Sequence, residues 1–561
     1  MDDYPYDLGT YSRPVTTDSP ATQRWFDRGL AWLYGFNHEE AIACFTRALE
    51  HDPGCAMAHW GIAYGAGPNY NMPWSIFDAD GKARALARAF DAAEQARQAS
   101  GRASPPEAAL IAALAARYPQ RDPIEDQSPW DDAFADAMRA AHAAHPEDPE
   151  IAAILADALM NRTPWKMWDL RRGTPADGAD TQEAMAVLET ALARPGGMDH
   201  PGLTHLHVHL MEMSPHPERA LHSADALRRM VPDAGHLVHM PTHIDMLCGQ
   251  YHDVVHWNER AVEADLKYLA REGAMNIYTG YRQHDYHFVI YGALFLGRIE
   301  PALRAVRGMA DTTPEELLRL ESPPMADYFE SYLAMEAHVL IRFGKWDEIL
   351  ALPFPKNPAL YCTQEITLIY ARGVALAALG RVAEAEAEEA RFLDRLAAYP
   401  ETRLLHNNRV LDLMRIAREM LRGEILYRKG AHDAAFHHLR AAVAAEDALP
   451  YDEPWGWMQP SRHALGALLL EQGRIEEAEA VYRADLGLGG ALPRAQIHPD
   501  NVWSLRGLHD CLTARTAPEA EIAPIRQKLD IALARADARL AASCFCARAA
   551  GAAPCRDVQR R

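Results

Sequence analysis

Residues 25–53 read WFDRGLAWLYGFNHEEAIACFTRALEHDP, and this stretch shows most directly how the chain folds. Large and small side chains recur at helical spacing on both sides of Gly35. Small residues allow two antiparallel helices to cross closely, while the large ones fill the grooves between them, and a proline is common just after a helix ends. The pattern consists of Trp25, Gly29, Trp32, Ala41, Phe45, Ala48 and Pro53. It predicts two helices joined by a short turn.

The same turn recurs along the chain. A glycine stands five or six residues before an alanine that opens a second helix, at Gly35/Ala41, Gly297/Ala302, Gly380/Ala385, Gly430/Ala435 and Gly473/Ala478. Weaker turns lead from Gly249 to Val254 and from residues 214–217 to Ala220. Alternating β-branched runs are nearly absent, so little sheet is expected. These observations predict an all-α solenoid of stacked helix–turn–helix units.

This repeat resembles the tetratricopeptide family, whose unit is a helix–turn–helix of 34 residues. The resemblance covers most of residues 22–490, and it implies a superhelix whose first helices line a concave groove. We expect an extended arm at residues 1–21, one solenoid over residues 22–540 with histidine-rich repeats at about 199–300, and a tail at residues 541–561. The stretch GHLVHMPTH at residues 235–243 also resembles a histidine-rich type of bacterial tetratricopeptide protein.

Composition excludes several classes of function. The chain has 561 residues and a formal net charge of −21, so it lacks the basic footprint that binding to nucleic acid or to an anionic membrane requires. No apolar run is long enough to span a bilayer, and the first residues do not resemble an export signal. Eight cysteines are too few for a disulfide framework. We therefore expect a cytoplasmic protein, and we interpret Cys544, Cys546 and Cys555 as an incidental, reactive tail.

Three segments interrupt the repeats. They are rich in Pro, Trp, Gly and Asp and lie at residues 118–130, 161–181 and 449–460. Insertions into a solenoid are loops on one face, so these segments are candidates for covering a site.

Histidines are concentrated between residues 199 and 287, and they follow the repeat frame. With Ala220, Val254 and Ala302 as markers, the position fifteen residues earlier holds His205, His239 and His287. Eleven residues earlier lie His209, His243 and Tyr291, and eighteen residues earlier lie Gly202, His236 and His284. Residues four apart share one face of a helix, so His205/His209 and His239/His243 are equivalent pairs.

Equivalent positions on neighbouring units face the same groove, so these histidines are expected to converge. The candidate metal ligands are His205, His209, His239, His243, His284 and His287, with His236 as a ligand or as a partner of one. Glu212, Asp245 and Asp285 could complete the site or orient the imidazoles. His207 falls between the paired positions and is expected to point away.

Imidazole ligands suit copper, iron, zinc or nickel and disfavour magnesium and calcium. Six histidines divide into two sets of three, an arrangement that resembles the ligands of coupled binuclear copper proteins, which bind or activate dioxygen. We therefore predict a metal-dependent oxidoreductase or oxygenase with copper or iron, possessing Tyr291, Glu212 and Asp285 as catalytic candidates. The alternatives are a zinc-dependent hydrolase and a non-catalytic scaffold that binds peptides in its groove.

Other residues are candidates for contacting a small organic substrate. His59 and Trp60 lead into a segment rich in amides and aromatic rings that contains Asn69 and Asn71. We predict that these four residues bind the substrate, and that the solenoid surface can also hold a protein partner.

Overall fold

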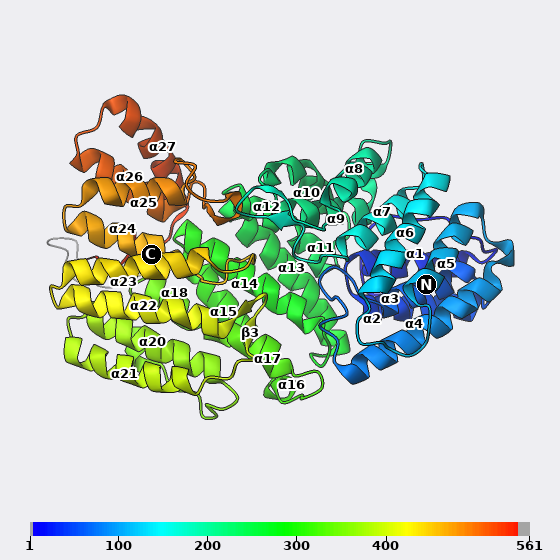
Figure 1. The fold of residues 1–561 in the computed structure, drawn as a ribbon, viewed down its shortest axis with the longest axis horizontal. Helices are drawn as coiled ribbons and strands as arrows, with labels where there is room; N and C mark the ends of the chain where they lie inside the picture. The colour runs from blue at the N-terminus through cyan, green and yellow to red at the C-terminus, as the bar shows by residue number, and fades with distance from the viewer. Residues whose placement is uncertain (1–3, 548–561) are drawn as a thin grey trace. The chain divides into compact units, whose positions relative to one another are not determined.

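The computed structural model describes residues 4–547, and these residues are predominantly helical (Figure 1). Contacts within the chain divide it into two compact units, and the main boundary falls inside one helix, after Asp285. Among the described residues, unit 1 comprises 4–285 with 320–324 and 493–495, and unit 2 comprises the rest of the chain up to residue 547. The boundaries expected from the sequence, with one solenoid over residues 22–540, remain a prediction.

Unit 1 contains thirteen complete α-helices in its described residues. They are α1 Pro20–Tyr34, α2 His38–His51, α3 Ala56–Ala66, α4 Ala79–Ala99, α5 Pro105–Arg117, α6 Ser128–Ala144, α7 Pro149–Met160, α8 Thr181–Leu192, α9 Pro201–Glu212, α10 Leu221–Leu227, α11 Gly235–His239, α12 Pro241–Leu247 and α13 Tyr251–Glu272. Helix α14, Thr279–Leu296, begins in unit 1 and ends in unit 2.

Unit 2 continues with the remaining helices. They are α15 Ile299–Asp311, α16 Glu315–Leu318, α17 Met325–Phe329, α18 Met335–Arg342, α19 Trp346–Ala351, α20 Cys362–Ala378, α21 Val382–Ala397, α22 Val410–Arg428, α23 His432–Asp447, α24 Ser461–Glu471, α25 Ile475–Asp485, α26 Val502–Ala514 and α27 Glu519–Arg535. Strands in the described residues form two short antiparallel hairpins, β1 Trp168–Asp169 with β2 Thr174–Pro175 and β3 Leu404–Leu405 with β4 Asn408–Arg409. The predicted all-α fold is confirmed.

Small residues permit the helix crossings that the sequence predicts. Phe45 of α2 lies between Gly29 of α1 and Gly61 of α3, and a Cβ atom on either glycine would lie 2.6 Å from the Phe45 ring. An aromatic ring also packs against a glycine in unit 2, where a Cβ on Gly466 would lie 2.5 Å from the ring of Tyr482. Buried large side chains in these grooves supply the continuous core of a solenoid.

The turns between paired helices require a left-handed residue, and most use glycine. Gly297, Gly380, Gly430 and Gly473 have φ between 70° and 78°. Glycine adopts this conformation without the Cβ clash that other residues incur. In the first repeat the left-handed residue is instead Phe36, with φ 54°, while the preceding Gly35 has φ −81°.

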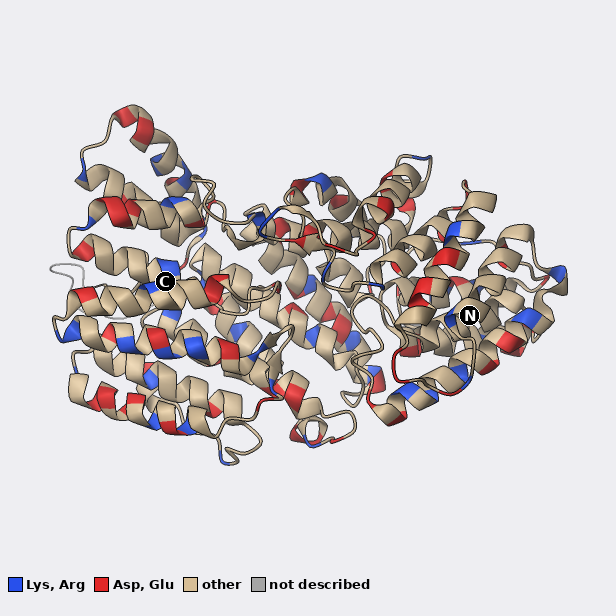
Figure 2. Ribbon diagram, in the orientation of Figure 1, with Lys and Arg blue, Asp and Glu red and all other residues tan. Residues whose placement is uncertain are grey.

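Charged residues of both signs are interspersed along the helices of unit 2 (Figure 2). Neighbouring helices are joined by ion pairs such as Arg372–Glu388 at 2.8 Å, Lys429–Glu386 at 2.6 Å and Arg422–Glu389 at 3.1 Å. Exposed pairs of this kind contribute little stability each.

The predicted insertions are largely loops. Residues 118–127 and 161–180 lie outside helices, although Ser128 already opens α6 and the second segment contains β1 and β2. Residues 449–460 also lie outside helices and are almost entirely buried. Within the described part of the chain, no helix is long and apolar enough to cross a membrane.

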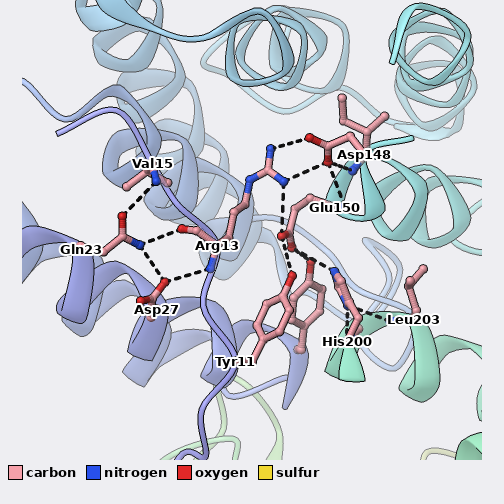
Figure 3. Close-up of polar contacts among 12 residues, drawn as sticks. Tyr11, Arg13, Val15, Gln23, Asp27, Asp148, Glu150, His200 and Leu203 are labelled. Atoms are coloured by element: carbon pink, nitrogen blue, oxygen red, sulfur yellow. Dashed lines mark hydrogen bonds and ion pairs between the residues drawn. The ribbon is translucent and has the colours of Figure 1, made fainter. Parts of the chain in front are cut away.

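The N-terminal arm, residues 4–19, runs over unit 1 without forming a helix or a strand. Arg13 makes two hydrogen bonds to Asp148, at 2.9 and 3.0 Å, and Tyr11 donates to Glu150 at 2.9 Å (Figure 3). Glu150, fully buried on α7, also accepts a hydrogen bond from Tyr34 and lies 3.6 Å from His200. His200 in turn caps α9, because its Nδ1 accepts the backbone N–H groups of residues 202 and 203. The arm therefore fixes the start of α9.

The Glu150→Gln variant is expected to be less stable than the wild type at neutral pH. Burial alone would raise the pKa of Glu150, but His200, Arg13 and Tyr34 lower it to about 2. A carboxylate with a lowered pKa stabilises the fold above its unfolded value of 4.5, by about 3 kcal/mol here, and loses that contribution as the pH falls toward 2. Thermal unfolding across pH 7 to 3 should show the gap between variant and wild type closing below about pH 4.5. Glu147→Gln, at an exposed side chain, is the control, and a gap that is independent of pH would contradict this account.

Candidate metal centre

Six buried histidines of unit 1 form two sets of three. Trio 1 is His205, His209 and His236, and trio 2 is His239, His243 and His284. Within each trio, one ring nitrogen from each residue lies within 4.8 Å of the others. The exposed fraction of these residues is at most 8%, so each trio offers imidazole nitrogens in a space shielded from water.

Helical spacing brings the first pair together on α9. The ring centroids of His205 and His209, four residues apart, are separated by 4.8 Å. His207 lies on another face of the helix, where its Nδ1 is 2.8 Å from the hydroxyl of Ser223 on α10. The prediction that His207 points away from the paired histidines is confirmed.

The second pair spans a break between two short helices. Pro241 has no N–H and opens α12, so α11 ends at His239. The backbone of Met240 between them remains helical, and Thr242 donates its hydroxyl hydrogen to the carbonyl of His239 at 2.7 Å. The His239 and His243 rings consequently keep the separation of a continuous helix, 4.8 Å between centroids.

The third ligand of each trio comes from the next repeat. His236 and His284 both stand eighteen residues before their repeat markers, and each joins the pair of the preceding repeat. The equivalent position in the first histidine repeat is Gly202, where a Cβ would lie 2.3 Å from the ring of Tyr34. Pairing with the following repeat explains how six of the seven predicted ligands divide into two trios.

The two trios are adjacent. The rings of His209 and His243 are 6.3 Å apart, and those of His236 and His239 are 5.9 Å apart. Two metal ions bound in the trios would therefore be close neighbours.

In trio 1 the nitrogens that face inward have no hydrogen-bond partner among the described residues. His205 donates from Nδ1 to the carbonyl of Tyr34 at 2.7 Å, which leaves its Nε2 unprotonated and without a partner. Nε2 of His209 and both nitrogens of His236 also have none. Burial and the neighbouring imidazoles lower the pKa of His205 and His236 well below 6.5, so both rings are neutral. Buried polar atoms are nearly always paired, and a metal ion is the partner that these lone pairs fit.

Glu212, at the end of α9, connects the two trios. One of its oxygens lies 3.0 Å from Nδ1 of His209, and the other lies 2.7 Å from Nδ1 of His243. Although burial opposes ionisation, the two histidines lower the pKa of Glu212 to about 2. The ionised carboxylate therefore lies within ion-pair distance of one imidazole of each trio, where it can orient both rings.

In trio 2 two inward nitrogens face each other closely. Asn258 uses its amide N–H groups on Thr242 and Val254, so its oxygen accepts the Nδ1–H of His239 at 2.6 Å. Nδ1 of His243 lies 2.7 Å from a carboxylate oxygen of Glu212. The Nε2 atoms of the two rings are 2.9 Å apart. Nitrogen ligands about 2.0–2.1 Å from one ion, at right angles to each other, have this separation.

A pair of carboxyl groups lies behind trio 2. Asp285 is 3.3 Å from Nδ1 of His239, and its carboxyl group lies near that of Asp265 of α13. Burial and the neighbouring Asp265 raise the pKa of Asp285 well above its ordinary value. The absence of a side chain at Gly235 leaves room for the carboxyl group of Asp265, because a Cβ at Gly235 would lie 2.0 Å from one of its oxygens.

One other predicted ligand, His287, and one predicted carboxylate, Asp245, have different partners. His287 belongs to unit 2, where its Nε2 lies 2.8 Å from the sulfur of Met458. Asp245 forms an ion pair with Arg228, at 2.6 and 2.7 Å. Neither belongs to a trio.

The remaining predicted site residues are dispersed. Tyr291 lies in unit 2, 3.4 Å from Nε2 of His498, and His59 is half-buried beside the carbonyl of Pro53. Trp60 stacks on Tyr64. Asn69 lines a small cavity with His205, and Asn71 lies beside the hydroxyl of Tyr281.

Cysteines play no part in either trio. Cys544 and Cys546 form a disulfide, so the interpretation of this segment as a reactive tail needs revision, while Cys555 lies outside the described residues.

Sequence reasoning missed Tyr34 and Asn258, whose oxygens hold His205 and His239. The signal for Asn258 was an amide one turn after the marker Val254 in an otherwise repetitive second helix. The carbonyl of Tyr34 had no signal, since any residue carries one.

Comparison with known proteins identifies the repeat but not a function. Residues 23–55 match the family model of the tetratricopeptide repeat. No curated protein matches the chain. Solved structures that it matches include Naa15/Naa10 bound to HypK-THB, at 13% identity and TM-score 0.21, covering 91% of this chain and 70% of that one. Another is the APC/C hetero-tetramer Cut9-Hcn1, at 11% identity and TM-score 0.25, covering 92% and 96%. The chain thus contains a tetratricopeptide repeat at residues 23–55, within a helical solenoid.

Proposed function

We propose that unit 1 binds two transition-metal ions, one in each histidine trio, and that the protein is an oxidoreductase acting on a small organic substrate. The observation that carries the metal proposal is the convergence of three buried imidazoles in each trio, with one ring nitrogen from each residue within 4.8 Å of the others.

The donor set favours a functional site over a structural one. Structural zinc sites are closed by four ligands and usually include cysteine, whereas each trio supplies three imidazoles and leaves a coordination position open. Stacked helices already bury a continuous core without a metal. Imidazole ligands suit copper and iron. Two adjacent ions of these metals, when bound, would exchange electrons with a bound molecule.

Elemental analysis of protein prepared without a histidine tag tests the metal proposal. We expect about two equivalents of transition metal, or their recovery on reconstitution, because three neutral imidazoles per ion bind such metals tightly. Protein that is metal-free and cannot be reconstituted would contradict the proposal.

Reductant and oxygen separate redox chemistry from hydrolysis. With copper or iron bound, visible or paramagnetic signals should respond to a reductant, and exclusion of oxygen should abolish turnover. A colourless zinc protein, equally active without oxygen, would replace the oxidoreductase by a zinc hydrolase whose ion activates water.

The repeat match supports a second candidate at least as directly, a non-catalytic scaffold that binds a protein partner. The tetratricopeptide unit at residues 23–55 and the paired helices α20–α25 are the observations in its favour. A scaffold retains its partner after chelation of metal, so partner binding that is unchanged in metal-free protein would favour this candidate. The histidine-rich stretch at residues 235–243 is, in our proposal, the mark of a metal-binding variant of such scaffolds.

A further inference from the structure

The two trios have different surroundings. Aromatic rings surround trio 1: Phe36 packs on His205, His209 and His236 with centroids 4.6, 5.8 and 5.3 Å away. Tyr70 lies 4.9 Å from His209, and Tyr281 lies 4.5 Å from His236. Trio 2 contacts the polar groups of Asn258 and Asp285, and Glu212 contacts one histidine of each trio. A molecule that approaches trio 1 therefore meets an apolar surface.

Two of the rings around trio 1 are held by unusual backbone conformations. Phe36 has φ 54° and Trp165 has φ 59°, and the rings of both pack near His209, Trp165 at 5.9 Å. Left-handed φ is unfavourable for a non-glycine residue, and such residues cluster at functional sites. The corresponding turns at Gly297, Gly380, Gly430 and Gly473 use glycine, so an aromatic ring at position 36 is retained at an energetic cost.

A small cavity adjoins trio 1. His205 and Phe36 line it together with the apolar side chains of Leu33, Ala153, Ile154 and Leu206. It admits a molecule of only a few heavy atoms. Nε2 of His205, the proposed ligand atom, has no hydrogen-bond partner, and His205 is 1% exposed.

Most polar side chains that line the cavity have partners within the protein. His38 is neutral, because burial and Arg117 lower its pKa to about 4, and Asn69 lies 3.3 Å from its Nε2. Asp157 accepts a hydrogen bond from Tyr64 and lies near the guanidinium of Arg117. A neutral, largely apolar molecule fits this lining better than an ion.

We infer that a small, neutral, apolar molecule of the size of dioxygen reaches the ion of trio 1 through this cavity, while the ion of trio 2 is enclosed by polar groups. The inference rests on the proposed metal centre, and it assigns the two ions different roles. The ion of trio 1 binds the incoming molecule, and the ion of trio 2 is held by protein ligands and their carboxylate partners.

Nitric oxide, a small and nearly apolar diatomic molecule, probes the route in reduced, metal-loaded protein. Ala153→Leu extends a side chain into the cavity and should lower the association rate of nitric oxide at least tenfold, with two equivalents of metal retained. Ala152→Leu is the matched control, because Ala152 is an equally buried neighbour on α7 that does not line the cavity. It should bind nitric oxide at the wild-type rate.

Ile154→Ala widens the cavity and covers the case in which Ala153→Leu does not fold. It should bind nitric oxide at least as fast as the wild type, and its crystals should take up xenon beside His205 under pressure. Equal association rates in fully metal-loaded Ala153→Leu and Ala152→Leu would overturn the route and leave the metal centre intact. For Ile154→Ala, slower binding of nitric oxide than in the wild type, or the absence of xenon beside His205, would also overturn the route. Wild-type protein that binds no metal would overturn the proposed function and this inference with it.

Discussion

Replacing His243 by alanine is expected to remove the ion of trio 2 and to leave the ion of trio 1 bound. The variant loses one of the three ligand nitrogens of trio 2, so only two imidazoles remain to hold that ion and water can reach it. Trio 1 keeps all of its ligands. Alanine is favourable in helices, so the helical content should be unchanged. Elemental analysis should show one equivalent of metal in place of two, and circular dichroism should match the wild type.

The grouping of ligands can be tested in the same experiment. His284→Ala should lose the same ion as His243→Ala, and His236→Ala should lose the other ion together with His205→Ala. His207→Ala is the control, because its ring is bonded to Ser223, and it should retain both ions. Loss of metal from His207→Ala, or equal loss of both ions from every variant, would contradict the division into two trios.

Replacing Glu212 by glutamine is expected to lower the binding affinity of both ions at once. A neutral amide no longer provides a carboxylate oxygen to His209 in trio 1 and to His243 in trio 2, so neither ring is held in its orientation with the same strength. Loss of such a partner typically lowers metal affinity 10–100-fold, and here the loss applies to both sites. Competition with a chelator should measure it.

Glu218→Gln, at an exposed carboxylate beside His216, is the control for this change and should leave both affinities unaltered. Weakening of only one ion in Glu212→Gln would show that the carboxylate does not connect the trios.

Much of the fold could be predicted from local sequence. Glycine against a large ring at helix crossings, as at Gly29 and Phe45, and a left-handed glycine at the turn, as at Gly430, are each dictated by sterics that a single repeat displays. The division into two units could not be predicted, since it depends on contacts between distant segments. The short helices α11 and α12 follow from Pro241, a signal that the repeat frame had masked.

The sequence predicted which residue types form the candidate site better than it predicted how the histidines divide into trios. The spacing of four residues placed His205 with His209 and His239 with His243. It could not show that His236 and His284 complete the pairs of the preceding repeats, or that His287 has Met458 as its neighbour. These outcomes depend on the stagger between successive helices. The left-handed conformation of Phe36, which sets its ring against trio 1, likewise has no signature in the sequence.

The central claim is that unit 1 holds two ions, each bound by three histidines. A crystal structure of metal-loaded protein, with anomalous scattering recorded at the absorption edge of the metal, tests it most directly. We predict two anomalous peaks, one among His205, His209 and His236 and one among His239, His243 and His284, each with nitrogens at about 2.0–2.1 Å. No peak in either trio, or a single ion bound by histidines of both, would contradict it.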